Sequence, residues 1–201
     1  MRRRIGVFGG SFDPPHVGHL LMASDAVEAL GLERLLFVPA ATQLLKAGRA
    51  TASAAHRLAM VRALVADDPR FAVDPIEIDR GGLSFTVETL ETLGARWPDV
   101  ELVLLAGADV LTSFHQWRAP QRVRALATLV VLARAVGGGT GTPSVPAVPP
   151  DFPGGPPVLL HTRRVDVSST EVRARIAEGR AIRGFVPESV ADLIRSAGLY
   201  R

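Results

Sequence analysis

Short apolar runs alternate with helical patterns along this 201-residue chain, and no other feature constrains its fold as strongly. Runs of strand length recur at 4–8, 35–38, 71–78, 101–105, 128–132 and 158–160. Apolar residues at helical spacing lie between or after them, at 17–30, 53–66, 84–96, 168–177 and 187–197. Strands that alternate with helices favour parallel pairing. The sequence therefore predicts an α/β fold, with a doubly wound, mainly parallel sheet flanked by helices.

Two segments stand apart from this alternation. Residues 137–157 begin with Gly-Gly-Gly-Thr-Gly and continue with repeated prolines, which exclude a helix or a central strand. We expect a flexible surface loop there. Residues 168–201 should form a small C-terminal helical part of the same domain, so residues 1–201 are expected to make a single domain.

Composition narrows the classes of protein. The chain has no cysteine, which excludes disulfides, thiolate metal sites and a cysteine nucleophile. Its longest apolar stretches are too short for a membrane helix, and its N-terminus lacks the apolar core of a signal peptide, so we expect a cytoplasmic protein without a membrane partner. The net charge is only +3, and the basic residues are scattered. This distribution disfavours a nucleic-acid partner and is compatible with anionic substrates.

The segment Gly9 to His19 joins the first predicted strand to the first predicted helix, a common ligand position in open parallel sheets. Gly9 and Gly10 let backbone N–H groups approach an anion closely. The helix that begins near Val17 directs unpaired N–H groups and its positive end toward the same place. His16 and His19 are three residues apart, so both can lie on one face, and Gly18 leaves room beside them. The pattern predicts a site for nucleotide phosphates.

Other phosphate, hydrolase and metal motifs fit this segment less well. A Walker A loop needs a lysine after its last glycine, and none follows here. A serine hydrolase elbow needs glycine where Asp13 stands. A zinc site would need a third ligand from His56, His115, His161 or a distant carboxylate. Two glycines near residue 138 resemble a dinucleotide fingerprint, but the prolines that follow exclude its helix.

Two motifs in the chain resemble those of the nucleotidyltransferase superfamily. Residues 9–19 resemble G-[ST]-F-D-P followed by H-x-G-H, and residues 168–173 resemble I-S-S-T-x-[IV]-R. Within the superfamily, the whole chain resembles the bacterial nicotinate-nucleotide adenylyltransferases. That closer resemblance lies in Ser-Phe-Thr-Val-Glu-Thr-Leu at 84–90, Gly-Ala-Asp at 107–109, Phe-His-Gln-Trp at 114–117 and Gly-Leu-Tyr at 198–200. It implies a Rossmann-like fold.

The resemblance implies that the phosphate of nicotinate mononucleotide attacks the α-phosphorus of ATP, giving deamido-NAD and pyrophosphate in NAD biosynthesis. Mg²⁺ would bind mainly through ATP, with no dedicated carboxylate site in the protein. Ser11, His16, His19 and Lys46 would carry the catalysis, with His19 stabilising the α-phosphoryl group. The implied ATP-binding residues are Gly9, Gly10, Ser11, His16, Gly18, His19, Arg134, Ser169, Thr170 and Arg173.

The acceptor would lie against residues from the middle of the chain. Trp117 would stack on the pyridine ring, and backbone N–H groups near Thr86, Val87 and Arg118 would receive its carboxylate. Asp109 would bind ribose or adenosine hydroxyls. The implied acceptor-binding residues are Phe85, Thr86, Val87, Asp109, Trp117 and Arg118.

Two more residues complete these predictions. Lys46 is the only lysine of the chain and follows Leu44-Leu45, where the family has Pro-His. We expect Asp13 to cap the glycine-rich turn through its side chain.

Rival interpretations stay open at this point. The same chemistry could serve nicotinamide mononucleotide or phosphopantetheine as the acceptor. A different class of protein, a non-catalytic nucleotide- or nucleic-acid-binding protein, would use the same phosphate site without turnover. The sequence also leaves a homo-oligomer open.

Overall fold

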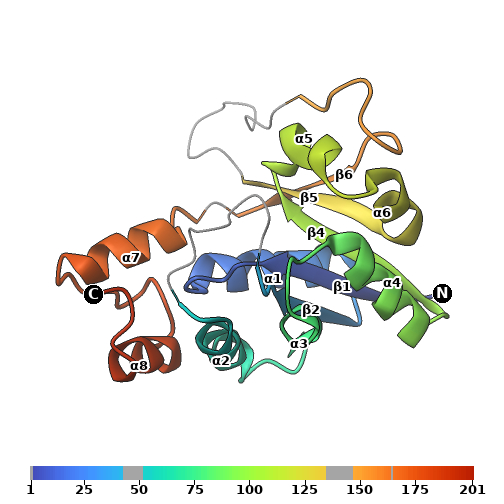
Figure 1. Cartoon of the computed structure of the whole chain (residues 1–201). Helices are drawn as coiled ribbons and strands as arrows, with labels where there is room; N and C mark the ends of the chain where they lie inside the picture. The colour runs from blue at the N-terminus through green and yellow to red at the C-terminus, as the bar shows by residue number, and fades with distance from the viewer. Residues whose placement is uncertain (1, 43–51, 135–146, 164) are drawn as a thin grey trace.

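The computed structural model describes residues 2–42, 52–134, 147–163 and 165–201. These residues include one six-stranded sheet, in which every neighbouring pair is parallel. Its strands are β1 (Arg3–Gly10), β2 (Arg34–Pro39), β3 (Phe71–Val73), β4 (Val100–Gly107), β5 (Thr128–Arg134) and β6 (Val158–Thr162). The order β3-β2-β1-β4-β5-β6 reverses direction between β1 and β4 (Figure 1). The predicted doubly wound α/β fold is confirmed.

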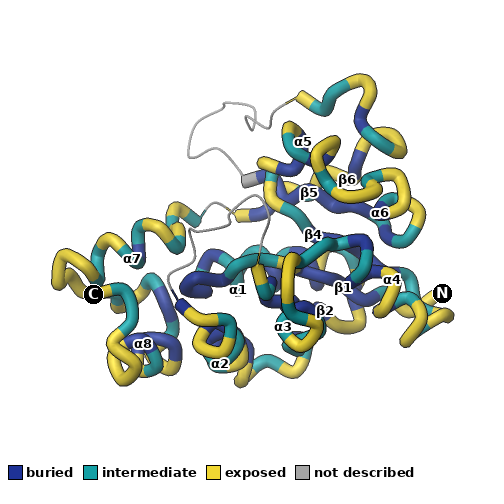
Figure 2. Tube along the Cα trace, in the orientation of Figure 1, coloured by how far each residue is buried: buried dark blue, intermediate teal, exposed yellow. Residues whose placement is uncertain are grey.

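Alternating side chains along the strands build two apolar clusters, one on each face of the sheet. On β1, Phe8 joins the first cluster, while Ile5 and Val7 join the second. The helices that cover the first face are α1 (Val17–Leu30), α2 (Ala54–Val65), α7 (Ser169–Ala177) and α8 (Glu188–Ser196). Those on the second face are α4 (Thr86–Arg96), α5 (Val110–Ser113), η2 (Phe114–Gln116) and α6 (Pro120–Leu126). The middle of β1, β2, β4 and β5 is buried, whereas β6 at the edge of the sheet is mostly exposed (Figure 2).

The predicted strand over residues 71–78 is wrong in its second half. β3 ends at Val73, and a short helix, α3 (Ile76–Arg80), follows at once. Asp74 explains the break, because its Oδ1 accepts the N–H of Ile76 at 3.1 Å and its Oδ2 pairs with Arg96 at 2.5 Å. The apolar residues keep alternating beyond Val73, although the side chain of Asp74 ends the strand there.

Two other stretches differ from a simple reading of the sequence. The segment 110–126, where no element was predicted, holds α5, η2 and α6, each seven residues or shorter. Residues 135–146, which include much of the predicted loop, lie outside the described residues. In the described end of that loop, Phe152 is buried and stacks on Phe114, with ring centroids 5.1 Å apart. That end therefore contributes to the second cluster.

The C-terminal helices return the chain to its beginning. Ser168 caps α7 as expected, its hydroxyl accepting the N–H of Glu171 at 3.1 Å. After α8, Gly198 adopts a left-handed conformation (φ 59°), which ends the helix and redirects the chain. In Figure 1, α7 and α8 lie together at the end of the molecule opposite the N-terminus. The last residues thereby reach the turn that follows β1.

Candidate active site

The turn between β1 and α1 lies at the carboxyl edge of the sheet, beside the point where the strand order reverses. Phe12, Asp13 and His16 of this turn are each at most 4% exposed. Phe12 has φ 49°, an uncommon conformation for a bulky residue, and its ring packs against Phe8 and Phe37. A Cβ on Gly10 would stand 3.0 Å from the Phe12 ring, so glycine here makes room for that ring.

The two histidines of the motif lie together, as the spacing predicts. Their ring centroids are 3.7 Å apart, and the backbone N–H of His16 donates to Nδ1 of His19 at 3.1 Å. Because Nδ1 of His19 accepts a hydrogen bond, a neutral His19 ring carries its proton on Nε2. The ring also packs edge-on against Phe12. The geometry thus prepares His19 to donate from Nε2.

Gly18 makes room for a protein ring. A Cβ on Gly18 would lie 2.9 Å from Nδ1 of His16, so a side chain here would displace that ring. The contact of Gly18 with ATP stays a prediction.

The start of α1 is electrostatically suited to an anion. The helix has 14 residues, and its first turn contains no acidic residue to offset the positive end. His16 occupies the N-cap position in an extended conformation. The N–H of Val17 donates to the carbonyl of Phe185 at 2.9 Å, which ties this helix end to the C-terminal segment.

The C-terminal motif meets the N-terminal turn directly. The hydroxyl of Ser169 donates to the carbonyl of Pro14 at 2.8 Å, across 155 residues of sequence. Arg173 donates from Nη1 to the carbonyl of Asp13 at 2.6 Å and from Nη2 to the hydroxyl of Thr170 at 3.2 Å. The structure therefore brings together the two motifs, and it adds a loop-holding role to residues that we expected to bind phosphate.

Arg57 of α2 also holds this turn, and the sequence reasoning missed it. The residue is 3% exposed, and its guanidinium donates to three backbone carbonyls. Nη1 reaches Ser11 at 2.8 Å, Nη2 reaches Ala41 at 2.9 Å, and Nε reaches Ala52 at 3.3 Å. Burial lowers the pKa of Arg57, an effect that the negative charge of Asp13 opposes. A signal existed, since Arg57 lies four residues before buried Val61 on the inner face of α2.

Tyr200 completes the set of residues around the turn. Its hydroxyl donates to Oδ1 of Asp13 at 2.7 Å, and the same oxygen accepts the N–H of Ala52 at 3.2 Å. Burial raises the pKa of Tyr200, and the hydrogen bond to the Asp13 carboxylate raises it further. We expected Asp13 to cap its own turn, and the structure adds two partners that lie 187 and 39 residues away in the sequence. Its carboxylate joins distant parts of the chain.

The predicted acceptor residues form a second group. Phe85 precedes the first residue of α4, and the Arg118 guanidinium lies 4.6 Å from the centroid of its ring. Arg118 also pairs with Glu88 at 2.7 Å. Trp117 is half-buried beside Phe114, with ring centroids 5.2 Å apart. Thr86 is half-buried, whereas the side chain of Val87 is in the core, so Val87 has only its backbone to offer a ligand.

The remaining predicted residues are Asp109, Arg134 and Lys46. Asp109 is exposed just beyond β4, and its Oδ1 lies 2.7 Å from where a Cβ of Gly107 would be, which explains that glycine. Arg134 ends β5 and pairs through its backbone with Thr162. Lys46 lies outside the described residues.

The described residues contain neither a candidate metal site nor a candidate membrane span. Among them, no three histidine or acidic side chains gather in a way that could hold a metal ion. None of their helices is both long and apolar enough to cross a membrane.

Comparisons with known proteins agree with one another. Residues 7–175 match the family model described as cytidylyltransferase-like. The chain is 52% identical over 198 residues to a probable nicotinate-nucleotide adenylyltransferase of Gemmatimonas aurantiaca, covering 98% of this chain and 92% of that protein. A protein of Thermus thermophilus with the same name is 43% identical, with 98% and 100% covered.

Solved structures show the same fold. The nicotinic acid mononucleotide adenylyltransferase of Plasmodium falciparum, complexed with NaAD, matches with a TM-score of 0.74 and 18% identity, covering 98% of this chain and 97% of that one. A putative nicotinate-nucleotide adenylyltransferase of Vibrio parahaemolyticus matches with a TM-score of 0.67 and 18% identity, covering 99% and 96%. At these identities the likeness concerns the fold alone.

Proposed function

Because the chain belongs to the cytidylyltransferase-like family and, within it, to the nicotinate-nucleotide adenylyltransferases, we propose that it transfers AMP from ATP to nicotinate mononucleotide. The products are deamido-NAD and pyrophosphate. The observation that carries the proposal for the site is the meeting of the two motifs at the turn after β1, through Ser169 with Pro14 and Arg173 with Asp13.

The reaction needs no protein nucleophile. A phosphate oxygen of the mononucleotide forms a bond to the α-phosphorus of ATP, while the bond from that phosphorus to the bridging oxygen of pyrophosphate breaks, and the leaving oxygen keeps the electron pair. The protein contributes by aligning the two substrates and by stabilising charge on the transferring group.

His19 is placed to stabilise that charge. We assign its Nε2–H to an oxygen of the α-phosphoryl group, because Nδ1 is occupied by the backbone of His16. The start of α1 adds the positive potential of a helix N-terminus. Gly9, Gly10 and Ser11 complete this side of the site.

We assign the β- and γ-phosphates of ATP to the C-terminal motif. A guanidinium carries five N–H donors, so Arg173 can hold the loop and still contact phosphate beside Ser169 and Thr170. Arg134 and Lys46 stay in the proposal as further phosphate ligands. Mg²⁺ would be held mainly by ATP oxygens and water, where it would neutralise phosphate charge.

The acceptor fits the second group of residues. We assign Trp117 to the pyridine ring as an aromatic stacking face. The backbone N–H groups of Thr86 and Val87, at the start of α4, and that of Arg118 are assigned to the nicotinate carboxylate. Phe85 supports the Arg118 side chain, and Asp109 is assigned to sugar hydroxyls. We propose that the enzyme works in the cytoplasm, where free nucleotides and Mg²⁺ are at hand.

A direct assay tests the function. The protein is incubated with ATP, Mg²⁺ and one acceptor at a time: nicotinate mononucleotide, nicotinamide mononucleotide or phosphopantetheine. Release of pyrophosphate and formation of the adenylated product are measured. We expect the highest kcat/KM with nicotinate mononucleotide. A preference for phosphopantetheine would replace this acceptor, and salt-sensitive nucleic-acid binding without turnover would favour the non-catalytic alternative.

A further inference from the structure

The last ordered turn of the chain is bonded to the motif turn that carries the proposed chemistry. Tyr200 donates to the carboxylate of Asp13 at 2.7 Å, and Asp13 is 3% exposed. A buried carboxylate is costly unless its oxygens receive hydrogen bonds. The Tyr200 hydroxyl therefore stabilises Asp13 where it stands, three residues before His16.

Arg57 acts on the same turn from the opposite direction. Its guanidinium bonds the carbonyl of Ser11 and also the carbonyls of Ala41 and Ala52, one on each side of the undescribed segment 43–51. The N–H of Ala52 in turn donates to Asp13. Arg57, Ala52, Asp13 and Tyr200 thus form one connected set of bonds around the turn.

The motif turn depends on such bonds for its shape. Residues 11–16 belong to no helix or strand, so the regular backbone bonds of secondary structure do not hold them. Phe12 adopts φ 49°, which a bulky residue keeps only where its surroundings enforce it. A small shift here would move His16 and, through its N–H, the ring of His19.

We propose that Tyr200 and Arg57 are positioning residues for adenylyl transfer: through Asp13 and Ser11 they hold the turn in the conformation that directs His19 at the reacting phosphoryl group. The proposal rests on the proposed function. The C-terminal tail thereby has a role in catalysis, although it lies 187 residues from Asp13 in the sequence. Neither residue touches substrate in this proposal.

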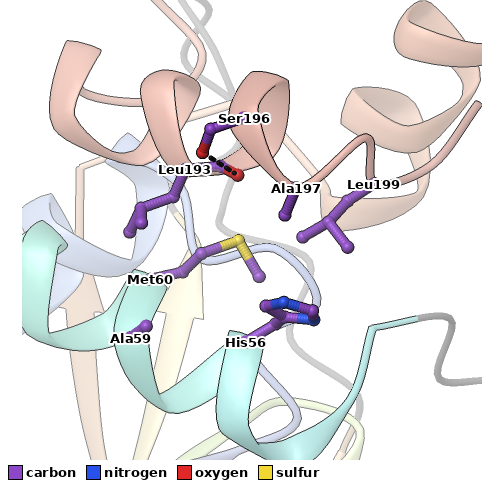
Figure 3. Close-up of a pocket in the computed structure, with 7 residues that line it drawn as sticks. All are labelled: His56, Ala59, Met60, Leu193, Ser196, Ala197 and Leu199. Carbon is purple, nitrogen blue, oxygen red and sulfur yellow. Dashed lines mark hydrogen bonds between the residues drawn. The ribbon is translucent and has the colours of Figure 1, made fainter.

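The packing around the tail supports a specific role for the hydroxyl. A hollow of about 270 Å³ lies where α2, α8 and the tail meet (Figure 3), and its lining comprises His56, Ala59, Met60, Leu193, Ser196, Ala197 and Leu199. In the sequence, His56 directly precedes Arg57, and Leu199 directly precedes Tyr200. Leu199 and Tyr200 pack against the first cluster, and the bond from Tyr200 to Asp13 adds a directional polar contact between the tail and the turn.

The hollow also provides a matched control. Leu199→Ala removes apolar contacts of the tail without touching the hydroxyl of Tyr200, whereas Tyr200→Phe removes the hydroxyl and keeps the ring. Ser196→Ala is a second control, since its hydroxyl donates only within its own helix, to Leu193 at 3.2 Å. All three variants keep the residues of the site.

The first experiment compares kcat, the KM for each substrate and Tm. For Tyr200→Phe we expect kcat to fall about tenfold, with each KM changed less than about threefold. Leu199→Ala should lower Tm at least as much but keep kcat within about twofold at 25 °C. Equal losses of kcat in both variants, or none in Tyr200→Phe, would overturn the role of Tyr200.

Arg57→Lys separates geometry from charge. Lysine keeps the positive charge but cannot donate to three carbonyls in the arrangement of the guanidinium. We expect a loss of kcat of about tenfold or more. A variant that folds with full kcat would show that the charge alone suffices and would remove Arg57 from the proposal.

A readout without turnover separates this proposal from the proposed function. Histidine ring ¹⁵N spectra report the hydrogen bond at Nδ1 of His19. We expect Tyr200→Phe to move the His16 and His19 signals and to leave His161, on β6, unchanged. If these signals stay in place in an active enzyme, positioning through Tyr200 is wrong. If they move although the wild type does not adenylate nicotinate mononucleotide, the proposed function is wrong and the positioning effect on the turn stands.

Discussion

The two halves of the proposed site are held in different ways. The turn on the ATP side is bonded by residues from three distant places, at 57, 169–173 and 200, and its Asp13 is 3% exposed. On the acceptor side, Arg118 and Glu88 pair across 30 residues, and the Arg118 side chain is 57% exposed. We infer from this difference that buried residues align the phosphates of ATP, whereas more exposed residues determine which acceptor binds.

This contrast predicts two kinds of variant. Changes on the ATP side should lower kcat or the free energy of unfolding, since they disturb the reacting geometry or buried bonds. Changes on the acceptor side should chiefly alter the KM for the acceptor and leave the fold intact.

The largest effect is expected at His19. Removal of its Nε2–H in His19→Ala should lower kcat about 100- to 1000-fold, the usual loss for a donor to a charged transition state. The KM for ATP should change less than about threefold, because several other groups hold the phosphates. Steady-state pyrophosphate release checks this. His161→Ala, at an exposed position of β6, is the control and should behave as wild type.

Asp13 and Asp109 compare the two halves by stability. Asp13→Ala leaves the hydroxyl of Tyr200 and the N–H of Ala52 without this acceptor, so we expect the free energy of unfolding to fall by about 2–4 kcal/mol. Asp109→Ala, at an exposed position, should change it by less than about 0.5 kcal/mol. Urea denaturation measures both. A similar loss of unfolding free energy in both variants would contradict the claim that the ATP side is held by buried bonds and the acceptor side is not.

Trp117 tests the acceptor side. Loss of a stacking face in Trp117→Ala should raise the KM for nicotinate mononucleotide about tenfold and leave the KM for ATP unchanged, since aromatic stacking on a base contributes about 1–3 kcal/mol. Trp97→Phe is a matched control, because Trp97 packs on the second cluster at the end of α4 and should affect Tm alone. An unchanged acceptor KM in Trp117→Ala would place this ring in the core.

A smaller effect is expected at Glu88. Its carboxylate pairs with Arg118 and places negative charge beside the proposed site of an anionic acceptor. Glu88→Gln should therefore lower the acceptor KM about two- to threefold, and the difference should shrink in high salt. A raised KM would mean that Glu88 serves mainly to hold Arg118 in place. Stability should change by less than about 1 kcal/mol, as for other exposed pairs.

The smallest effect is expected from Asp25 of α1, which pairs with Arg163 at 2.6 Å. Burial raises the pKa of Asp25, but the hydrogen bonds and charge of Arg163 outweigh it, so the net pKa is lowered. Because the pKa is lower in the folded state, the ionised carboxylate stabilises the fold at pH values above the ordinary aspartate pKa of about 3.9. This stabilisation is lost as the pH falls through the pKa of the folded state. Asp25→Asn should thus cost stability at pH 7, by less than about 1 kcal/mol, and the cost should shrink as the pH falls below the ordinary aspartate value.

The sequence predicts what depends on neighbours along the chain. Helix α1 has the predicted bounds, and the pair of His16 and His19 follows from a spacing of three residues. The family resemblance assigns both motifs to ATP, and in the structure the hydroxyl of Ser169 donates to the carbonyl of Pro14 in the other motif.

What the sequence could not predict depends on contacts between distant segments. The three carbonyls bound by Arg57 lie 5, 16 and 46 residues away, and no spacing rule records them. The space at Gly18 is taken by a ring two residues earlier, which only coordinates reveal. Asp74 ends β3 through its own side chain, against the apolar alternation that predicts a longer strand.

A crystal structure with a non-hydrolysable ATP analogue and Mg²⁺ tests the central claim most directly. We predict that the α-phosphoryl group lies within hydrogen-bonding distance of Nε2 of His19, at the start of α1, with the outer phosphates toward Arg173. An analogue bound elsewhere, with both histidine rings facing only protein, would contradict the assignment of this turn as the site of adenylyl transfer.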